Sequence, residues 1–157
     1  KQNHLGYSIP RRCRQQNMTD FEDKIIEGEN LPTIEMLITQ SKIDEYSVAS
    51  GDFNPIHINQ DFTKDTEFGS TIAHGMMVAA TISESLAAAF DRNWLENGRL
   101  KLKFKSPVFP GDKISTFGKI DQVLMCGREK SVTCSIGIKK INGEVVIVGN
   151  ALLTIPV

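Results

Sequence analysis

The stretch from His74 to Phe90 constrains the fold of this 157-residue chain more than any other part. It reads HGMMVAATISESLAAAF and contains a single acidic residue, Glu84. Small and apolar residues would lie on every side of a helix formed by this run, so burial is expected on most of its sides. The small side chains also let neighbouring backbone approach closely. We therefore expect a long central helix that the rest of the chain must cover.

Downstream of this run the apolar residues change from a period of 3.6 to a period of 2. Leu100, Leu102 and Phe104 alternate with basic residues, which predicts a half-buried strand. Further segments of this kind span residues 114–125, 132–138 and 145–155. An earlier strand is expected at 33–39, and Asn-Gly at 142–143 is a strong hairpin signal. These elements predict an α+β fold in which a curved antiparallel sheet wraps around the helix.

An acid and a histidine stand five residues apart in the sequence SGDFNPIH. A helix of about ten residues precedes them and ends at Gly51, which suits the left-handed geometry of a helix C-terminus. Pro55 fixes its own φ and restricts Asn54 to extended backbone. We therefore expect Asp52 and His57 in an irregular but constrained connection.

Asp52 and His57 together offer a proton acceptor and a group that titrates near neutral pH. Such a pair can activate water for addition across an activated double bond, and the amide of Gly75 can stabilise the enolate-like oxygen. Residue types alone favour a structural role instead, with Asp52 as a turn former and His57 as a core histidine. His74 is expected to orient the Gly75 turn.

The charge balance excludes several classes of partner. With 18 basic and 19 acidic residues, the chain has no overall field that attracts nucleic acid or an acidic membrane. Its longest apolar run is too short and too rich in small polar residues for a membrane span. Only three histidines are present, one of them His4, so no zinc set is expected. The row Lys101, Lys103 and Lys105 is either a solvated face or a contact for phosphates of an anionic ligand.

Residues 1–20 are rich in arginine and contain one acid, Asp20, without the apolar segment of a secretory signal. We expect a loosely held arm at 1–20 and a single domain at 21–157. We expect a cytoplasmic location. An organelle matrix such as the mitochondrial one is the alternative, because the acid-poor start is similar to the tail of a transit peptide.

The run YSVASGDFNPIH, followed about twenty residues later by AHGMM, resembles the signature of MaoC-like hot-dog proteins. These include (R)-specific enoyl-CoA hydratases and (R)-3-hydroxyacyl-thioester dehydratases. The resemblance extends from about Leu31 to the C-terminus and includes FKSPVF with GD after it. It implies a five-stranded antiparallel sheet around helix 74–90 and a side-by-side homodimer with active sites near the interface. Thr63 departs from the small residue that commonly ends the signature.

The resemblance implies reversible hydration of trans-2-enoyl thioesters of CoA or acyl carrier protein to (R)-3-hydroxyacyl thioesters. Asp52 and His57 match the catalytic pair, and no metal or redox cofactor is implied. Asn54 matches a loop-organising position, and Gly75 matches the amide that contacts the thioester carbonyl. From the position of the helix at 74–90, we also expect the acyl chain to lie along its surface of small and apolar residues. The expected substrate-binding residues are Asn54, Gly75, Met76, Met77 and Ala80.

Two other functions remain open at this point. A hot-dog acyl-thioesterase would use a carboxylate to direct water at the thioester carbonyl, and the GDFNPIH run argues against it. A non-catalytic subunit that binds acyl thioesters would not need Asp52 and His57, and both residues are present.

Overall fold

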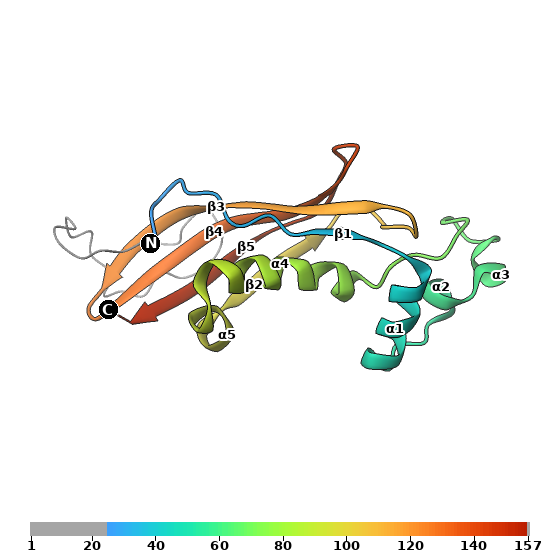
Figure 1. The fold of residues 1–157 in the computed structure, drawn as a ribbon, viewed down its shortest axis with the longest axis horizontal. Helices are drawn as coiled ribbons and strands as arrows, with labels where there is room; N and C mark the ends of the chain where they lie inside the picture. Colours follow the sequence, from blue (N-terminus) through green and yellow to red (C-terminus); the bar gives the residue numbers. More distant parts are fainter. Residues whose placement is uncertain (1–24, 157) are drawn as a thin grey trace.

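The computed structural model describes residues 25–156, so the arm predicted at 1–20 lies outside the described residues. Five strands form one antiparallel sheet in the order β1-β3-β4-β5-β2 (Figure 1). The strands are β1 Glu35–Leu37, β2 Arg99–Phe104, β3 Lys113–Cys126, β4 Glu129–Lys140 and β5 Val145–Pro156. The helices are α1 Gln40–Ser50, α2 Pro55–Ile58, α3 Gln60–Thr63, α4 Gly75–Phe90 and α5 Arg92–Asn97.

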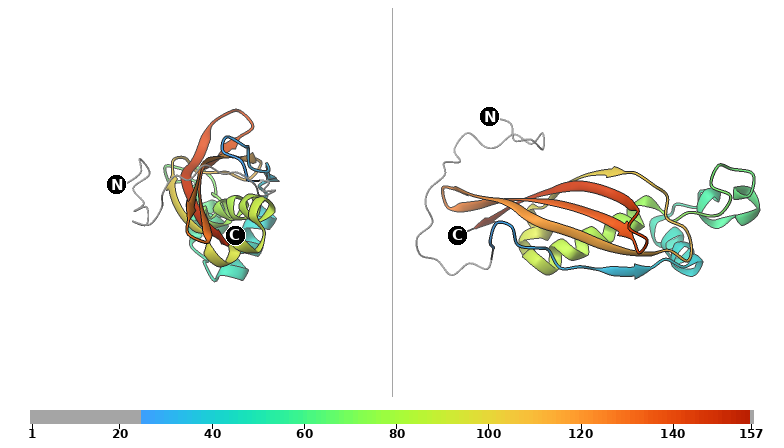
Figure 2. Two further views of the ribbon diagram at one scale, coloured as in Figure 1. Left: turned by 90° about the vertical axis from the view of Figure 1, so that its left-hand side faces the viewer. Right: turned by 90° about the horizontal axis from the view of Figure 1, so that it is seen from above.

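The predicted central helix and sheet are confirmed. Helix α4 lies along one face of the curved sheet, and α2 and α3 project beyond one end of it (Figure 2). Val78, Ile82 and Leu86 of α4 are buried in the core with residues of β3, β4 and β5. The helix is not covered all round, however, because Met76 and Ala80 begin an exposed stripe that continues at Glu84 and Ala88. No described helix combines the length and apolar character needed to cross a membrane.

Helix α1 ends immediately before Gly51, as the sequence predicted. The side chain of Thr39 accepts a hydrogen bond from the Lys42 amide at 3.3 Å and caps the N-terminus. At the other end Gly51 has a φ of 73°, and its amide donates to the Ser47 carbonyl. Because a residue with a side chain is strained in this conformation, the helix stops here and Asp52 follows directly.

The local structure around His57 differs from the prediction. His57 lies in the one-turn helix α2, whereas an irregular connection was expected. The Asn54 side chain caps α2 by accepting a hydrogen bond from the Ile56 amide at 3.2 Å, and Pro55 occupies the first helical turn. Asn and Pro initiate helices as well as turns, which explains the error. Helix α5 was not predicted.

Strand β2 is one of the two edge strands of the sheet and is less buried than predicted. It pairs with β5 on one side only. Leu100 is 38% exposed and Phe104 is 51% exposed, although their alternation predicted a half-buried strand. Within the described residues, the apolar face of β2 is therefore left partly uncovered.

The loop after β2 is fixed by a buried lysine. The Lys140 ammonium lies 3.1 Å from Asp112 and 3.2 Å from Glu144, and the Lys140 side chain is 8% exposed. Asp112 also accepts a hydrogen bond from the Phe109 amide at 2.9 Å. This network holds the loop that carries Val108. The loop lies against the segment between α2 and α4, because the Ala73 amide donates a hydrogen bond to the Val108 carbonyl.

Candidate functional site

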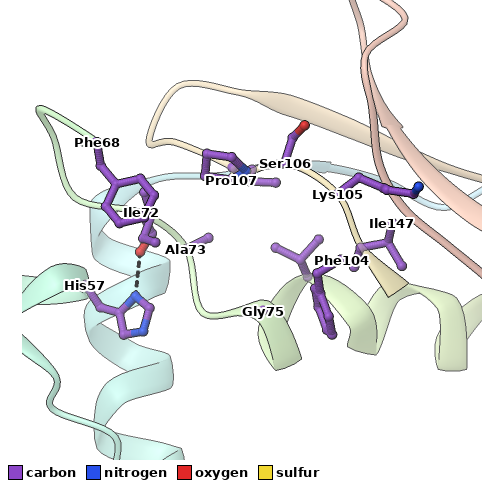
Figure 3. A pocket seen from close by; sticks show the side chains of 12 residues that line it. His57, Phe68, Ile72, Ala73, Gly75, Phe104, Lys105, Ser106, Pro107 and Ile147 are labelled. Carbon is purple, nitrogen blue, oxygen red and sulfur yellow. Dashed lines mark hydrogen bonds between the residues drawn. The ribbon is translucent and has the colours of Figure 1, made fainter. Parts of the chain in front are cut away.

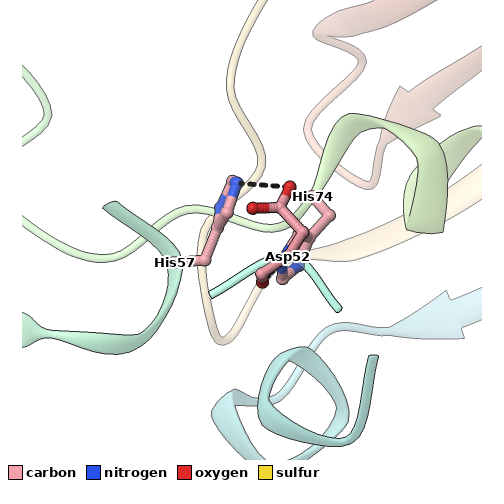
Figure 4. Close-up of side chains that lie close together, drawn as sticks. All are labelled: Asp52, His57 and His74. Atoms are coloured by element: carbon pink, nitrogen blue, oxygen red, sulfur yellow. Dashed lines mark hydrogen bonds and ion pairs between the residues drawn. The ribbon is translucent and has the colours of Figure 1, made fainter. Parts of the chain in front are cut away.

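Asp52 follows the C-terminal end of α1, and its carboxylate lies near the ring of His57. The distance between Asp52 Oδ2 and His57 Nε2 is 4.0 Å (Figure 4). This is too long for a direct hydrogen bond and leaves space for one water molecule to contact both groups. The Asp52 side chain is 54% exposed, and the His57 side chain is 10% exposed. The structure thus brings together the two residues that the motif singled out.

A backbone carbonyl group sets the orientation of the His57 ring. His57 Nδ1 lies 2.8 Å from the carbonyl oxygen of Ile72 (Figure 3). A carbonyl only accepts, so Nδ1 carries the hydrogen and Nε2 of the neutral ring is an acceptor. The Ile72 amide in turn donates to Ile56 at 3.1 Å. The lone pair of Nε2 is therefore aimed at the space beside Asp52.

His74 connects three parts of the site. Its ring stacks on His57 with centroids 3.8 Å apart, and it is 2% exposed. Its Nε2 donates to the Asp52 carbonyl at 3.0 Å and lies 3.4 Å from Ser47 Oγ. The sequence indicated a residue that orients the Gly75 turn. The stacking on His57 was not predicted, because it depends on how distant segments pack.

Asp52, His57 and His74 each place one potential metal-ligand atom within 4.8 Å of the others. Carboxylate and imidazole groups are common zinc ligands. The sequence predicted no zinc set, because only three histidines are present and one of them, His4, lies in the N-terminal arm. The prediction of a metal-free site therefore needs a direct test.

Cys134 takes no part in nucleophilic chemistry. It is a free cysteine buried in β4. Burial, with a smaller contribution from the charge of Asp121, raises the pKa of the Cys134 thiol to about 12. Because the thiolate is the nucleophilic form, this thiol is inert near neutral pH.

Two pockets meet at the site, and His57, Gly75 and Phe104 border both of them. The first, here called the polar pocket, has a volume of about 410 Å³. It is also lined by Tyr46, Ser50, Asp52, His74 and Met76. The second, here called the apolar pocket, has a volume of about 320 Å³ (Figure 3). It is also lined by Phe68, Ile72, Ala73, Val78, Lys105, Ser106, Pro107, Val108 and Ile147.

Gly75 presents a backbone amide at the boundary of the two pockets. It is the first residue of α4, and the preceding His74 makes no side-chain capping bond. The first amides of a helix have no partner within the helix, so they suit an anionic oxygen. A Cβ at Gly75 would lie 3.0 Å from the Phe104 ring. The absence of a side chain keeps this boundary open.

The predicted substrate-binding residues lie in different environments. Gly75 and Met76 line the polar pocket, and Asn54 caps α2. Met77 is buried in the core, and Ala80 is on the exposed stripe of α4. Neither of the last two lines either pocket.

Sequence reasoning did not assign Phe104 to the site. Its alternation with lysines indicated the face on which it lies, but not its proximity to the start of α4. The available signal was its place as the first residue of the FKSPVF segment that the resemblance included.

The family model and the similar proteins point to the same family. The model of the MaoC like domain matches residues 22–140. The chain is 33% identical over 140 residues to an (R)-specific enoyl-CoA hydratase of Rhodospirillum rubrum, covering 87% of this chain and 91% of that protein. It is 31% identical over 121 residues to a 3-hydroxybutyryl-CoA dehydratase of Methylorubrum extorquens, covering 76% of this chain and 74% of that protein.

Solved structures agree on the fold. An (R)-hydratase from A. caviae involved in PHA biosynthesis superposes with a TM-score of 0.71 at 23% identity, covering 85% of this chain and 98% of that chain. A monoamine oxidase regulatory protein from Archaeoglobus superposes with a TM-score of 0.75 at 24% identity, covering 84% and 91%. The antiparallel sheet around α4 is thus the hot-dog fold, and the chain belongs to the MaoC-like domain family.

Proposed function

We propose that this protein reversibly hydrates trans-2-enoyl thioesters to (R)-3-hydroxyacyl thioesters. The observation that carries the proposal is the pair of acceptors, Asp52 Oδ2 and His57 Nε2, 4.0 Å apart beside the amide of Gly75. The names of the similar hydratase and dehydratase support the same reaction class. The substrate class is an acyl thioester of CoA or of acyl carrier protein.

In hydration, a water molecule between Asp52 and His57 donates one hydrogen bond to each. Asp52 accepts a proton as the water oxygen bonds to C3, and the electrons of the C2–C3 double bond move toward the thioester carbonyl. That proton is then relayed through His57 Nε2 to C2, while the other hydrogen of the water stays on the new C3 hydroxyl group, so the net change is addition of one water molecule. Before the reaction, His57 holds the water by accepting a hydrogen bond from it. Each proton-transfer role of this kind contributes about 10²–10⁴ in rate.

The thioester oxygen gains negative charge when C3 is attacked. We propose that the Gly75 amide donates a hydrogen bond to this oxygen. The orientation of α4 supports this role, because the positive end of the helix dipole lies at Gly75. The charge is thereby stabilised without a cation.

The direct test is hydration of crotonyl-CoA, followed by loss of absorbance at the enoyl band. The wild-type protein is then assayed with longer enoyl chains and with acyl carrier protein as the carrier. Inactivity on every chain length and both carriers would rule out the hydratase proposal. Release of free CoA without a hydroxyacyl product would identify a thioesterase instead.

We expect the activity to be independent of metal ions. The mechanism uses a carboxylate, an imidazole and an amide, none of which needs a cation. After dialysis against EDTA, the rate of crotonyl-CoA hydration should stay unchanged. A loss of rate that added Zn²⁺ restores would instead show that Asp52, His57 and His74 hold a metal.

We also propose a homodimer that pairs through the β2 edge. The Lys105 amide donates to Val146 of β5 at 2.8 Å. Because amides alternate in direction along a strand, those of Leu100 and Leu102 point away from β5 toward the open edge. Unpaired strand edges with exposed apolar residues favour pairing with another chain.

Leu100→Pro tests this dimer because it removes one outward amide and leaves the bonds to β5 in place. Sedimentation velocity should show a dimer for the wild type and a shift toward monomer for Leu100→Pro. Leu100→Ala is the matched control, since it shortens the same side chain and keeps the amide. An unchanged dimer in Leu100→Pro, or a wild-type monomer, would contradict the proposed interface.

A further inference from the structure

The ring of Phe104 stands between the polar and the apolar pocket. Phe104 borders both pockets, and its Cε1 atom lies 3.0 Å from the position that a Cβ would take at Gly75 (Figure 3). Phe104 is 51% exposed in the single chain, so packing within the chain does not fully fix its ring. A molecule that reaches from one pocket into the other must pass His57, Gly75 and Phe104.

The two pockets differ in the polar side chains on their walls, although apolar atoms make up most of the exposed wall of both. The polar pocket holds the Asp52 carboxylate, the His74 ring and the Ser50 hydroxyl. The walls of the apolar pocket are mainly aliphatic and aromatic side chains, with Lys105 and Ser106 as polar members. Two of its lining residues, Val78 and Ile147, belong to the buried core. The two pockets therefore suit the two ends of a molecule that is apolar at one end and polar at the other.

An enoyl thioester has that character. Its acyl chain beyond C3 carries only C–H groups, whereas the carrier arm beyond the sulfur carries amides. If the reacting carbons lie at His57 and Gly75, which both pockets share, one arm extends into each pocket. Burial of the C–H arm in the apolar pocket is the favourable arrangement, because it leaves no polar group of the substrate unpaired.

We propose that the apolar pocket binds the acyl chain and that Phe104 sets the chain length that can enter it. This inference rests on the proposed hydratase function. A short chain ends at the Phe104 ring, and a longer chain must displace the ring to reach Val78 and Ile147. Phe104 is thus a specificity-determining residue of the reaction.

The test compares kcat/KM for crotonyl-CoA and trans-2-octenoyl-CoA in three variants. Each methylene that becomes buried is worth about fourfold in affinity, so Phe104→Ala should raise the octenoyl-to-crotonyl ratio by at least about tenfold. Phe104→Trp should lower this ratio. Phe117→Ala is the matched control, because Phe117 is also partly exposed but lines neither pocket. It should leave the ratio unchanged.

The outcomes separate this inference from the proposed function. An inactive wild-type protein would overturn both. An active wild type with the same ratio in Phe104→Ala and Phe104→Trp would overturn the inference alone. An equal change in kcat/KM for both chain lengths would also overturn it, since that result places the carrier arm and not the acyl chain beside Phe104. If Phe104→Ala fails to fold, the opposite shift in Phe104→Trp still decides the question.

Discussion

Asp52→Asn is expected to lower kcat for crotonyl-CoA hydration by about 10²–10⁴. The amide cannot accept the proton of the attacking water, but it has nearly the same shape as the carboxylate. Its oxygen can keep the hydrogen bond that Asp52 Oδ1 accepts from the Asn54 amide at 3.2 Å. Because the side chain is 54% exposed, the melting temperature should change little. Stopped-flow or steady-state absorbance at the enoyl band measures the effect.

Asp61→Asn is the matched control, since Asp61 is an exposed carboxylate in α3 that pairs with Lys64. It should retain the wild-type rate. His57→Gln should cause a loss similar to that of Asp52→Asn. The double variant should be little worse than either single one, because both residues act on one water molecule. A wild-type rate in Asp52→Asn would show that the proton acceptor is assigned to the wrong residue.

Gly75→Ala is expected to lower activity strongly and to change stability little. Alanine is favoured over glycine by about 1 kcal/mol in a helix interior, but Gly75 is the first residue of α4 and the new Cβ would press on the Phe104 ring, so the free energy of unfolding should stay close to the wild-type value. The added Cβ would stand at the boundary of the two pockets, where the thioester oxygen has to reach the amide. Loss of one such hydrogen bond typically costs about 10²–10³ in kcat. Urea unfolding and enzyme kinetics on the same preparation measure the two effects.

A second variant separates two causes of that loss. The Cβ at Gly75 would lie 3.0 Å from the Phe104 ring, so displacement of the ring is a second cause that could lower the activity. In Gly75→Ala/Phe104→Ala the ring is absent and the Cβ remains. We expect the activity of this double variant to stay low. Recovery to the activity of Phe104→Ala would show that the amide is not used and that the ring position is what matters.

The large elements of this fold were predictable because their signals are local. The run from Gly75 to Phe90 has the composition of a buried helix, and the alternation after Gly98 has the period of a strand. The end of α1 at Gly51 also followed from one residue type. The exposure of β2 was not predictable in the same way, because alternation does not reveal whether a strand is at the edge of the sheet.

The site was predictable only where one motif contains its parts. Asp52 and His57 belong to a single short segment, and their approach to 4.0 Å needs only α1, the turn and α2. The stacking of His74 on His57 and the contact of Phe104 with Gly75 depend on tertiary packing. Small apolar residues cover most of α4 in the sequence, so the pattern did not show that Met77 would be turned into the core and Ala80 toward solvent.

The identity of the product tests the central proposal most directly. The wild-type protein is incubated with crotonyl-CoA in water enriched in ¹⁸O, and the product is separated on a chiral column and analysed by mass spectrometry. We predict (R)-3-hydroxybutyryl-CoA with ¹⁸O on C3 and no label in the thioester group. The (S) isomer, or crotonate that carries ¹⁸O in its carboxylate together with free CoA, would contradict the proposal.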